Sequence, residues 1–192
     1  MIEEIFYKVE HEAKRFNPTF TWTDSVDEVA DAINRPHDDY PWRSQKTKEL
    51  IEKFLEGNLK PHMGMGSLHR ISEMDIKSMH GYLFDGLGFN QKHILRGAYR
   101  TTQVSITNQK TKEIVFTPPE PLQIPYLMSR IAPVAIGDNG GKSFSVTSQK
   151  ELVWWYRIFE TIHPFQDGNG RVGGIVVAIF SYSLYKKYLM PV

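Results

Sequence analysis

The feature that most constrains this fold is a break between two apolar helical segments in the last third of the chain. Pro164 interrupts the first segment, because proline lacks the N–H of the helical ladder and its ring clashes with the preceding turn. Gly168 and Gly170 then flank Asn169, and a second apolar segment covers residues 173–184. The N–H groups of such a turn can converge on an anion, and the helix that follows adds the positive end of its dipole. The backbone pattern alone therefore predicts a phosphate-binding loop.

Four side chains in the same short run add chemistry to this loop. Arg171 can contact phosphate oxygens in a bidentate manner. Asp167 is an oxygen ligand suited to Mg²⁺, which binds one or two carboxylates together with phosphates. Asn169 can donate to a phosphate oxygen, and His163 can take a proton from an incoming hydroxyl because it titrates near neutral pH. Together they are the parts that phosphoryl-type transfer needs.

A plainer alternative is a helix–turn–helix with a capping aspartate and a surface arginine. A loose glycine-rich turn alone would favour that alternative. Here the base, the metal ligand, the amide and the cation are compressed among the glycines, and we therefore favour the catalytic interpretation.

Helical signals dominate the rest of the chain. Ser25, Ser72 and Ser148 each precede an acidic residue by three positions, a pattern that predicts helix starts. Within one of these helices, His80 is expected to be a packed histidine rather than a ligand. From the spacing of apolar residues, helices are expected over about residues 2–9, 25–34, 44–56, 74–84, 122–131, 148–162 and 168–188.

One segment follows a different period. Val104 and Ile106, then Ile114 and Phe116, alternate with polar residues on either side of a turn at residues 108–111. This pattern predicts a β-hairpin. Two strands alone are marginally stable in water, so the hairpin must pack on the helices or serve a partner. The expected fold class is all-α, a helical bundle with one small β-hairpin.

Composition excludes several classes of protein. The chain has 192 residues with 23 basic and 22 acidic side chains, a balance that argues against a nucleic-acid surface. It has no cysteine, which excludes disulfides, thiolate zinc sites and cysteine nucleophiles. The apolar run at residues 174–180 is too short to span a bilayer, and the acidic start lacks the basic residues of a secretory signal. We expect a soluble, cytoplasmic protein.

The run 163–171, His-Pro-Phe-Gln-Asp-Gly-Asn-Gly-Arg, resembles the signature of the Fic (filamentation-induced) domain family at every fixed position. The resemblance extends upstream to residues 97–100 and the hairpin at 103–117, and downstream to residues 189–191. It covers roughly residues 45–192. The expected organisation is therefore an N-terminal helical extension at 1–44 and a Fic domain at 45–192.

The resemblance implies a helical domain with a hairpin flap that transfers AMP from ATP to a Ser, Thr or Tyr hydroxyl of a target protein and releases pyrophosphate. His163 would be the general base, and Asp167 would hold Mg²⁺ between the α- and β-phosphates. Residues 168–170 would bind the phosphates, with Arg171 on the outer ones. Val104 and Ile106 would belong to the flap that docks the target.

Three positions refine what the resemblance implies. The family's kinase branch carries lysine at the position of Gly170, so this chain does not match that branch. Many members have a second arginine where this chain has Gly174, and that arginine usually meets the γ-phosphate or an inhibitory glutamate. Glu56, followed by Gly-Asn, is the nearest match to the inhibitory pattern, but Glu52 stands where that pattern has Ser or Thr. We favour a solvated Glu56 near a helix end.

Several alternatives stay open at this point. The donor could be another nucleotide or carry phosphocholine, the same site could remove AMP, or the chain could be a nucleotide-binding module with little catalysis. The expected partner is a target protein, with an antitoxin or regulatory partner as a further alternative and neither membrane nor nucleic acid. Delivery to a host cell as an effector also stays open.

Overall fold

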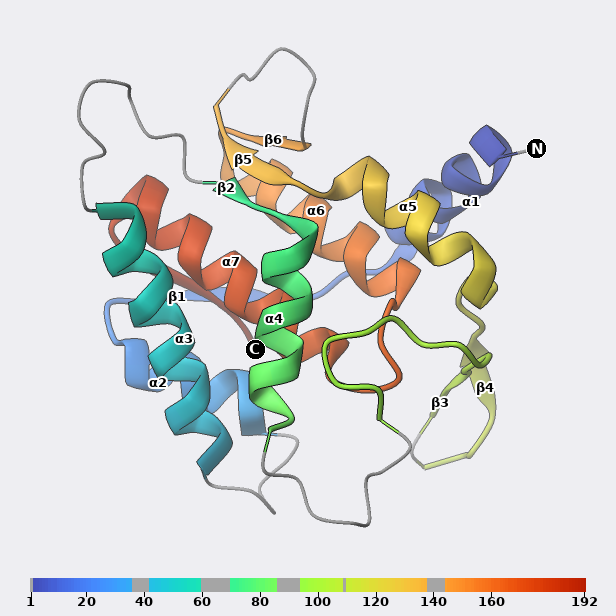
Figure 1. Cartoon of the computed structure of the whole chain (residues 1–192), viewed down its shortest axis with the longest axis horizontal. Coiled ribbons are helices and arrows are strands. Elements are labelled where there is room, and N and C mark those ends of the chain that lie inside the picture. The colour runs from blue at the N-terminus through green and yellow to red at the C-terminus, as the bar shows by residue number, and fades with distance from the viewer. Residues whose placement is uncertain (1, 36–41, 60–69, 86–93, 109, 138–143) are drawn as a thin grey trace.

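The structure is a computed structural model that describes residues 2–35, 42–59, 70–85, 94–108, 110–137 and 144–192. It is mostly helical, as the sequence predicts. The helices are α1 (Ile2–Arg15), α2 (Val26–Asn34), α3 (Trp42–Leu59), α4 (Glu73–Leu83), α5 (Ile124–Ile131), α6 (Gln149–Ile162) and α7 (Asn169–Tyr185) (Figure 1). A short 3₁₀ turn, η3 (Pro121–Gln123), precedes α5.

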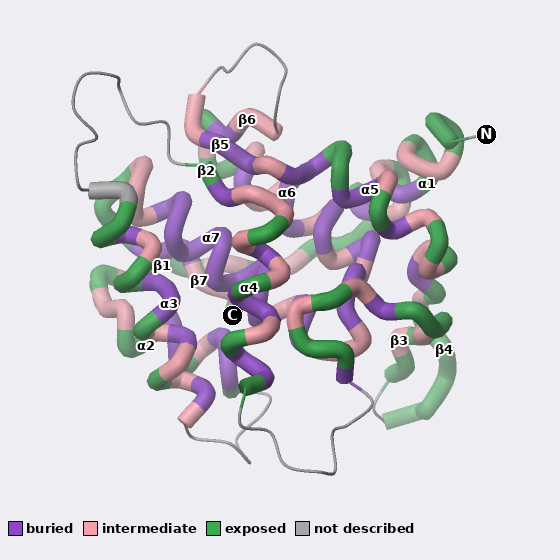
Figure 2. The backbone as a smooth tube through the Cα atoms, viewed as in Figure 1, coloured by how far each residue is buried: buried purple, intermediate pink, exposed green. Residues whose placement is uncertain are grey.

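Helix α7 lies at the centre of the molecule. Residues 171–181 are all buried, and Figure 2 shows the helix as an almost continuous buried tube. Helices α2, α3 and α6 and the C-terminal strand contact it. A helix that is apolar on all sides is stable only in such a position. The loop that precedes α7 is therefore anchored to the most rigid part of the core.

Capping explains where several helices begin. Ser72 and Asp75 exchange side-chain and backbone hydrogen bonds at the start of α4, and Ser148 and Glu151 do the same at α6, which confirms both capping boxes. At α2, Ser25 accepts from the backbone N–H of Glu28, but the Glu28 carboxylate accepts from the Thr23 hydroxyl instead of closing the box. Helix α3 continues through Gly57, which does not end it.

The predicted hairpin is present as the antiparallel pair β3 (Ile106–Thr107) and β4 (Ile114–Phe116). Val104 lies just before its first strand. The expectation of a single hairpin was too narrow, because the described residues contain two further small sheets. Strand β1 (Phe20–Thr23) pairs with β7 (Tyr188–Pro191), and β5 (Val134–Ile136) lies between β2 (Arg70–Ile71) and β6 (Phe144–Val146).

The end of α7 explains one of these sheets. Lys186 adopts a left-handed conformation with φ 58°, which ends the helix earlier than the predicted residue 188. The Ser181 hydroxyl accepts the backbone N–H of Leu189 at 2.8 Å and turns the chain back along α7. Strand β7 then pairs with β1. Strands of two to four residues carry too little alternation to be recognised in the sequence.

The N-terminal part is packed into the same core as the rest. Helix α2 contacts α7 and β7, and α1 contacts α6. A boundary between residues 44 and 45 would fall inside α3. In the described part of the chain, no helix is long and apolar enough to cross a bilayer.

Candidate active site

The loop between α6 and α7, whose course Figure 1 shows, is held in one conformation by its own side chains. His163 ends α6 with φ 51°, and Gly168 precedes α7 with φ 80°. Between them, the Phe165 N–H donates to Asn169 Oδ1 at 2.8 Å, and Asn169 Nδ2 donates to the Phe165 carbonyl at 2.9 Å. The Asn169 side chain is therefore committed to the loop. Its expected contact with phosphate stays a prediction that now rests on its backbone N–H.

Gly168 is required by both backbone conformation and space. Its positive φ is one that L-residues adopt at a cost. A Cβ at this position would lie 2.4 Å from Phe84 Cε2. The Phe84 ring of α4 thus lies directly against the loop, and only glycine allows that approach.

His80 supports the loop from below. Its side chain is completely buried and stacks on Phe165, with ring centroids 4.0 Å apart. The Gly97 N–H donates to Nδ1 at 3.0 Å, so the proton lies on Nε2, which donates to the Asp167 carbonyl at 3.1 Å. Burial, more than any charge, lowers the pKa of His80 to about 4. The sequence correctly predicted a packed histidine, but not that it holds the backbone of a candidate metal ligand.

His163 is placed to act as a base. Its N–H donates to the Phe159 carbonyl at 3.0 Å, and Nδ1 lies 3.4 Å from the Glu160 carbonyl. Burial lowers its pKa to about 4, and the charge of Arg100 contributes in the same direction. The imidazole is therefore neutral at pH 7. With the proton on Nδ1, Nε2 carries the lone pair that can accept a proton.

Arg100 connects this loop to the base of the flap. The side chain is 2% exposed, and Nε donates to the His163 carbonyl at 2.8 Å. Its backbone N–H donates to the Pro164 carbonyl at 2.9 Å. In the sequence, residues 97–100 carry only part of the resemblance, and no local pattern indicates this bridging role. The other acceptors of its guanidinium all belong to the flap base: Thr102, Gln103 and Pro119.

Arg171 is a buried cation with unused donors. It is 2% exposed, its Nη2 lies 3.1 Å from Asp167 Oδ2, and its guanidinium carbon lies 4.7 Å from the Phe84 ring centroid. Its Nε and Nη1 atoms make no hydrogen bond within the described part of the chain. Buried donors are usually satisfied, so a guanidinium in this state suits an anionic ligand.

Asp167 combines a fixed backbone with an accessible carboxylate. Its Oδ1 accepts the Gly168 N–H at 2.6 Å, and the side chain is 43% exposed. The described residues contain no cluster of three or more histidine or acidic side chains. This donor set fits Mg²⁺, which is commonly held by one carboxylate together with substrate phosphates.

Gly170 and Gly174, the two glycines at positions where family members differ, have different surroundings. A Cβ at Gly170 would lie at an ordinary distance of 3.8 Å from the Tyr156 hydroxyl. A Cβ at Gly174 would lie 3.0 Å from Cγ1 of Ile33. Ile33 of α2 therefore lies directly against the position where many family members have a second arginine.

The flap presents more apolar surface than the sequence indicated. Val104 and Ile106 are partly buried. On the opposite strand, Ile114 is 64% exposed and Val115 is 61% exposed. The structure thus adds two candidate docking residues that we missed, because Ile114 had been counted only as part of the alternation.

Glu56 lies far from this loop along α3. It is exposed and separated from Arg43, which is beside Phe84, by about 20 Å of helix. None of the contacts found in the described residues joins Glu56 to Arg171. Inhibition by Glu56 stays a prediction without support from this geometry.

Comparison with known proteins finds similarity in the segment that contains this loop. A model of the Fic/DOC family matches residues 70–181, more than half of the chain and including the entire loop. A protein of Aquifex aeolicus (strain VF5) described as "Probable protein adenylyltransferase" is 35% identical over 79 residues. That similarity covers 41% of this chain and 22% of the relative's length. On the family match, the chain belongs to the Fic/DOC family.

Proposed function

We propose that this chain is a protein adenylyltransferase that transfers AMP from ATP to a Ser, Thr or Tyr hydroxyl of a target protein. The observation that carries the proposal is the buried Arg171 guanidinium, whose unused donors lie beside the Gly168 turn and the Asp167 carboxylate. A neutral His163 at the start of the same loop supplies the base. The relative described as an adenylyltransferase supports the choice of AMP as the transferred group.

In the proposed reaction, His163 Nε2 takes the proton of the target hydroxyl as its oxygen attacks the α-phosphorus of ATP. The bond from the α-phosphorus to the bridging oxygen breaks, and pyrophosphate leaves with its electron pair. The N–H groups of residues 168–170 and the Arg171 guanidinium bind the phosphates and stabilise the charge that develops on them. Arg100 keeps the His163 carbonyl, and with it the direction of the imidazole, fixed.

Mg²⁺ would be held by Asp167 and would neutralise charge on the α- and β-phosphates. The Gly168 N–H contacts Oδ1 of the Asp167 carboxylate, and Arg171 contacts Oδ2. His80 contacts the backbone carbonyl of Asp167. These contacts orient the carboxylate before any ligand binds, which reduces the ordering cost of binding.

The flap is proposed to dock an extended segment of the target by adding a strand at its edge. An Ile106→Glu variant should then lose protein modification while ATP binding changes less than twofold. A Glu113→Gln variant at an exposed position of the same hairpin is the matched control. Equal losses of modification and ATP binding in the Ile106 variant would indicate general destabilisation and refute docking by the flap.

The test of the proposed function is incubation with Mg²⁺, a cell lysate and ATP, CTP, GTP or UTP labelled on the α-phosphate. We expect label from ATP on a protein band, and its loss in a His163→Ala variant. An exposed histidine, His11, provides the matched control as His11→Ala, which should keep full transfer.

The possible results separate the alternatives. Transfer from another nucleotide would keep the mechanism and change the donor. ATP binding by calorimetry without transfer to any protein would refute the proposed function and favour a nucleotide-binding module. Transfer that survives in the His163→Ala variant would refute the role of His163.

A further inference from the structure

We propose that Arg43 of α3 is a second phosphate-binding arginine, which contacts the outer phosphates of the nucleotide from outside the loop at residues 163–171. The inference deepens the proposed function and rests on it. It starts from two buried cations, Arg43 and Arg171, each 2% exposed. Their guanidinium carbons lie 5.8 Å and 4.7 Å from the centroid of one ring, that of Phe84.

The shared ring places both cations beside the phosphate-binding loop. The edge of Phe84 lies so close to Gly168 that a Cβ there would meet it at 2.4 Å. Two guanidinium groups around one ring concentrate positive potential at the loop. Such a site favours a ligand with several negative charges over one with a single phosphate, and ATP is such a ligand.

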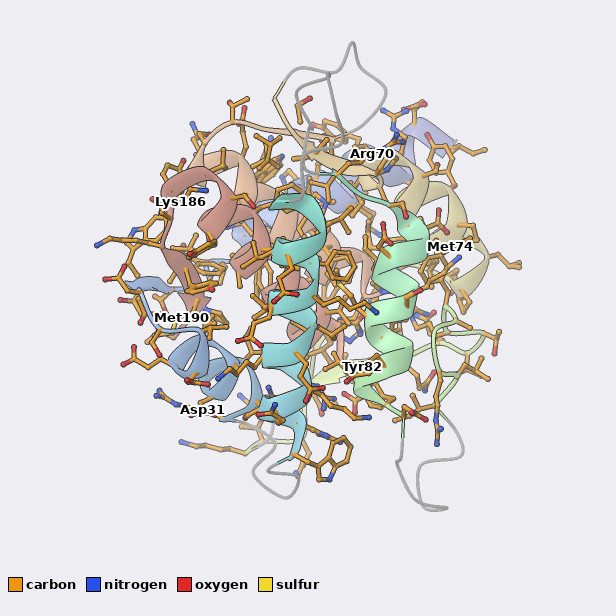
Figure 3. All side chains as sticks on the ribbon, turned by 60° about the vertical axis from the view of Figure 1, so that its left-hand side comes forward. Asp31, Arg70, Met74, Tyr82, Lys186 and Met190 are labelled. Atoms are coloured by element: carbon orange, nitrogen blue, oxygen red, sulfur yellow. The ribbon has the colours of Figure 1, made fainter. Side chains whose placement is uncertain are left out.

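Arg43 lies at the first turn of α3, which is held next to the C-terminal end of α4 (Figure 3). Lys46 Nζ donates to the Tyr82 carbonyl at 3.0 Å, and Arg43 and Thr47 lie one turn apart. Asn34 Nδ2 of α2 donates to the buried Thr47 hydroxyl at 2.9 Å. The first turns of α3, which carry Arg43, are therefore held against both neighbouring helices.

The N-terminal helices also pack against Gly174, the position of α7 at which many family members have a second arginine. Ile33 fills the space at Gly174, and the adjacent Asn34 anchors α3. Ile33 thus leaves little room beside Gly174, and the contact of Asn34 with Thr47 holds the first turns of α3 against α2. Both effects come from residues upstream of the segment that matches the family, 70–181.

The competing explanation is that Arg43 only packs. It lies 5.9 Å from the Trp42 ring centroid as well as near Phe84, and such contacts stabilise a fold without any ligand. A packing role would affect thermal stability and would weaken all nucleotides alike. A phosphate-binding role would weaken ATP much more than AMP, because only ATP carries the outer phosphates.

The experiment measures the Kd of ATP and AMP with Mg²⁺ by calorimetry in a His163→Ala background, where ATP is not consumed. We expect Arg43→Gln to weaken ATP binding about tenfold or more, the effect of losing hydrogen bonds to a charged group, and to change AMP binding less than twofold. Lys53→Gln removes a positive charge from an exposed position of the same helix and should leave both affinities unchanged.

Equal weakening of ATP and AMP, no weakening, or the same loss in Lys53→Gln would each overturn the role of Arg43. Should Arg43→Gln fail to fold, Arg43→Lys keeps the charge and removes the planar fork. An ATP-to-AMP preference in that variant equal to the parent's would overturn the role in the same way. If the wild-type chain binds ATP but modifies no protein, the proposed function is refuted. The role of Arg43 is still tested in that case, because its test measures binding alone.

Discussion

Replacement of His80 tests whether burial of a neutral imidazole supports the candidate active site. His80 is completely buried, accepts the Gly97 N–H and donates to the Asp167 carbonyl. Burial lowers its pKa to about 4 in the folded chain, against an ordinary value of 6.5. The folded-state pKa is depressed, so the unfolded chain binds more protons between pH 4 and 6.5. The stabilising contribution is present above pH 6.5 and is lost as the pH falls towards 4.

The size of this effect follows from the two pKa values. Each pKa unit corresponds to about 1.4 kcal/mol, so His80 contributes about 3 kcal/mol of pH-dependent stability at most. The assay is urea unfolding of wild type and His80→Gln between pH 4 and 7. We expect the difference in unfolding free energy between the two proteins to shrink by about 3 kcal/mol from pH 7 to pH 4. Using the difference removes the contributions of other titrating groups, such as Glu160.

The control is His11→Gln, since His11 is exposed and its substitution should leave the pH dependence as in wild type. A constant difference between wild type and His80→Gln across the pH range would refute the reasoning. It would mean that the pKa of His80 is the same in the folded and unfolded chains, so that burial does not favour the neutral ring.

Three further predictions concern the loop and its neighbours. Gly168→Ala should cost about 2 to 5 kcal/mol, from its left-handed φ and the contact with Phe84, whereas Gly170→Ala should change stability by less than about 1 kcal/mol; thermal unfolding distinguishes them. Asn169→Ala should cost about 2 to 4 kcal/mol in urea unfolding, because two backbone groups of the loop lose their partner; an unchanged midpoint would contradict this. Burial raises the pKa of Glu160 from 4.5 to about 8, so the stability of the fold falls as pH rises from 4.5 towards 8, and Glu160→Gln should gain Tm relative to wild type between pH 5.5 and pH 8.5.

The parts of the molecule that local sequence determines were predictable. The capping boxes of α4 and α6 depend on residues three positions apart, and both were identified correctly. The break at Pro164 and the glycines at 168 and 170 identified the loop, because its conformation depends mainly on its own residues. The hairpin followed from alternation over a few residues.

The supporting contacts of the loop were not predictable, because they join residues far apart in the chain. Arg100 meets the His163 carbonyl, and His80 meets the Asp167 carbonyl, across more than sixty residues in each case. Neither side chain carries a local pattern that indicates its partner. An arginine followed by polar residues usually lies on the surface, and Arg100 is buried only because flap and loop supply carbonyls around it.

Gly174 shows that a local sequence motif and the contacts between distant residues have to be interpreted together. From the motif alone, glycine at this position reads as the loss of a cation. In the fold, it is the position at which α2 packs most closely on α7 through Ile33. A glycine in the middle of a helix costs about 1 kcal/mol relative to alanine, so its presence here is offset by the close approach that it permits. Glycine at position 174 and the packing of α2 on α7 therefore belong together. Residues of α2 and α3 have to be considered, along with the motif, when the phosphate-binding residues of this chain are assigned.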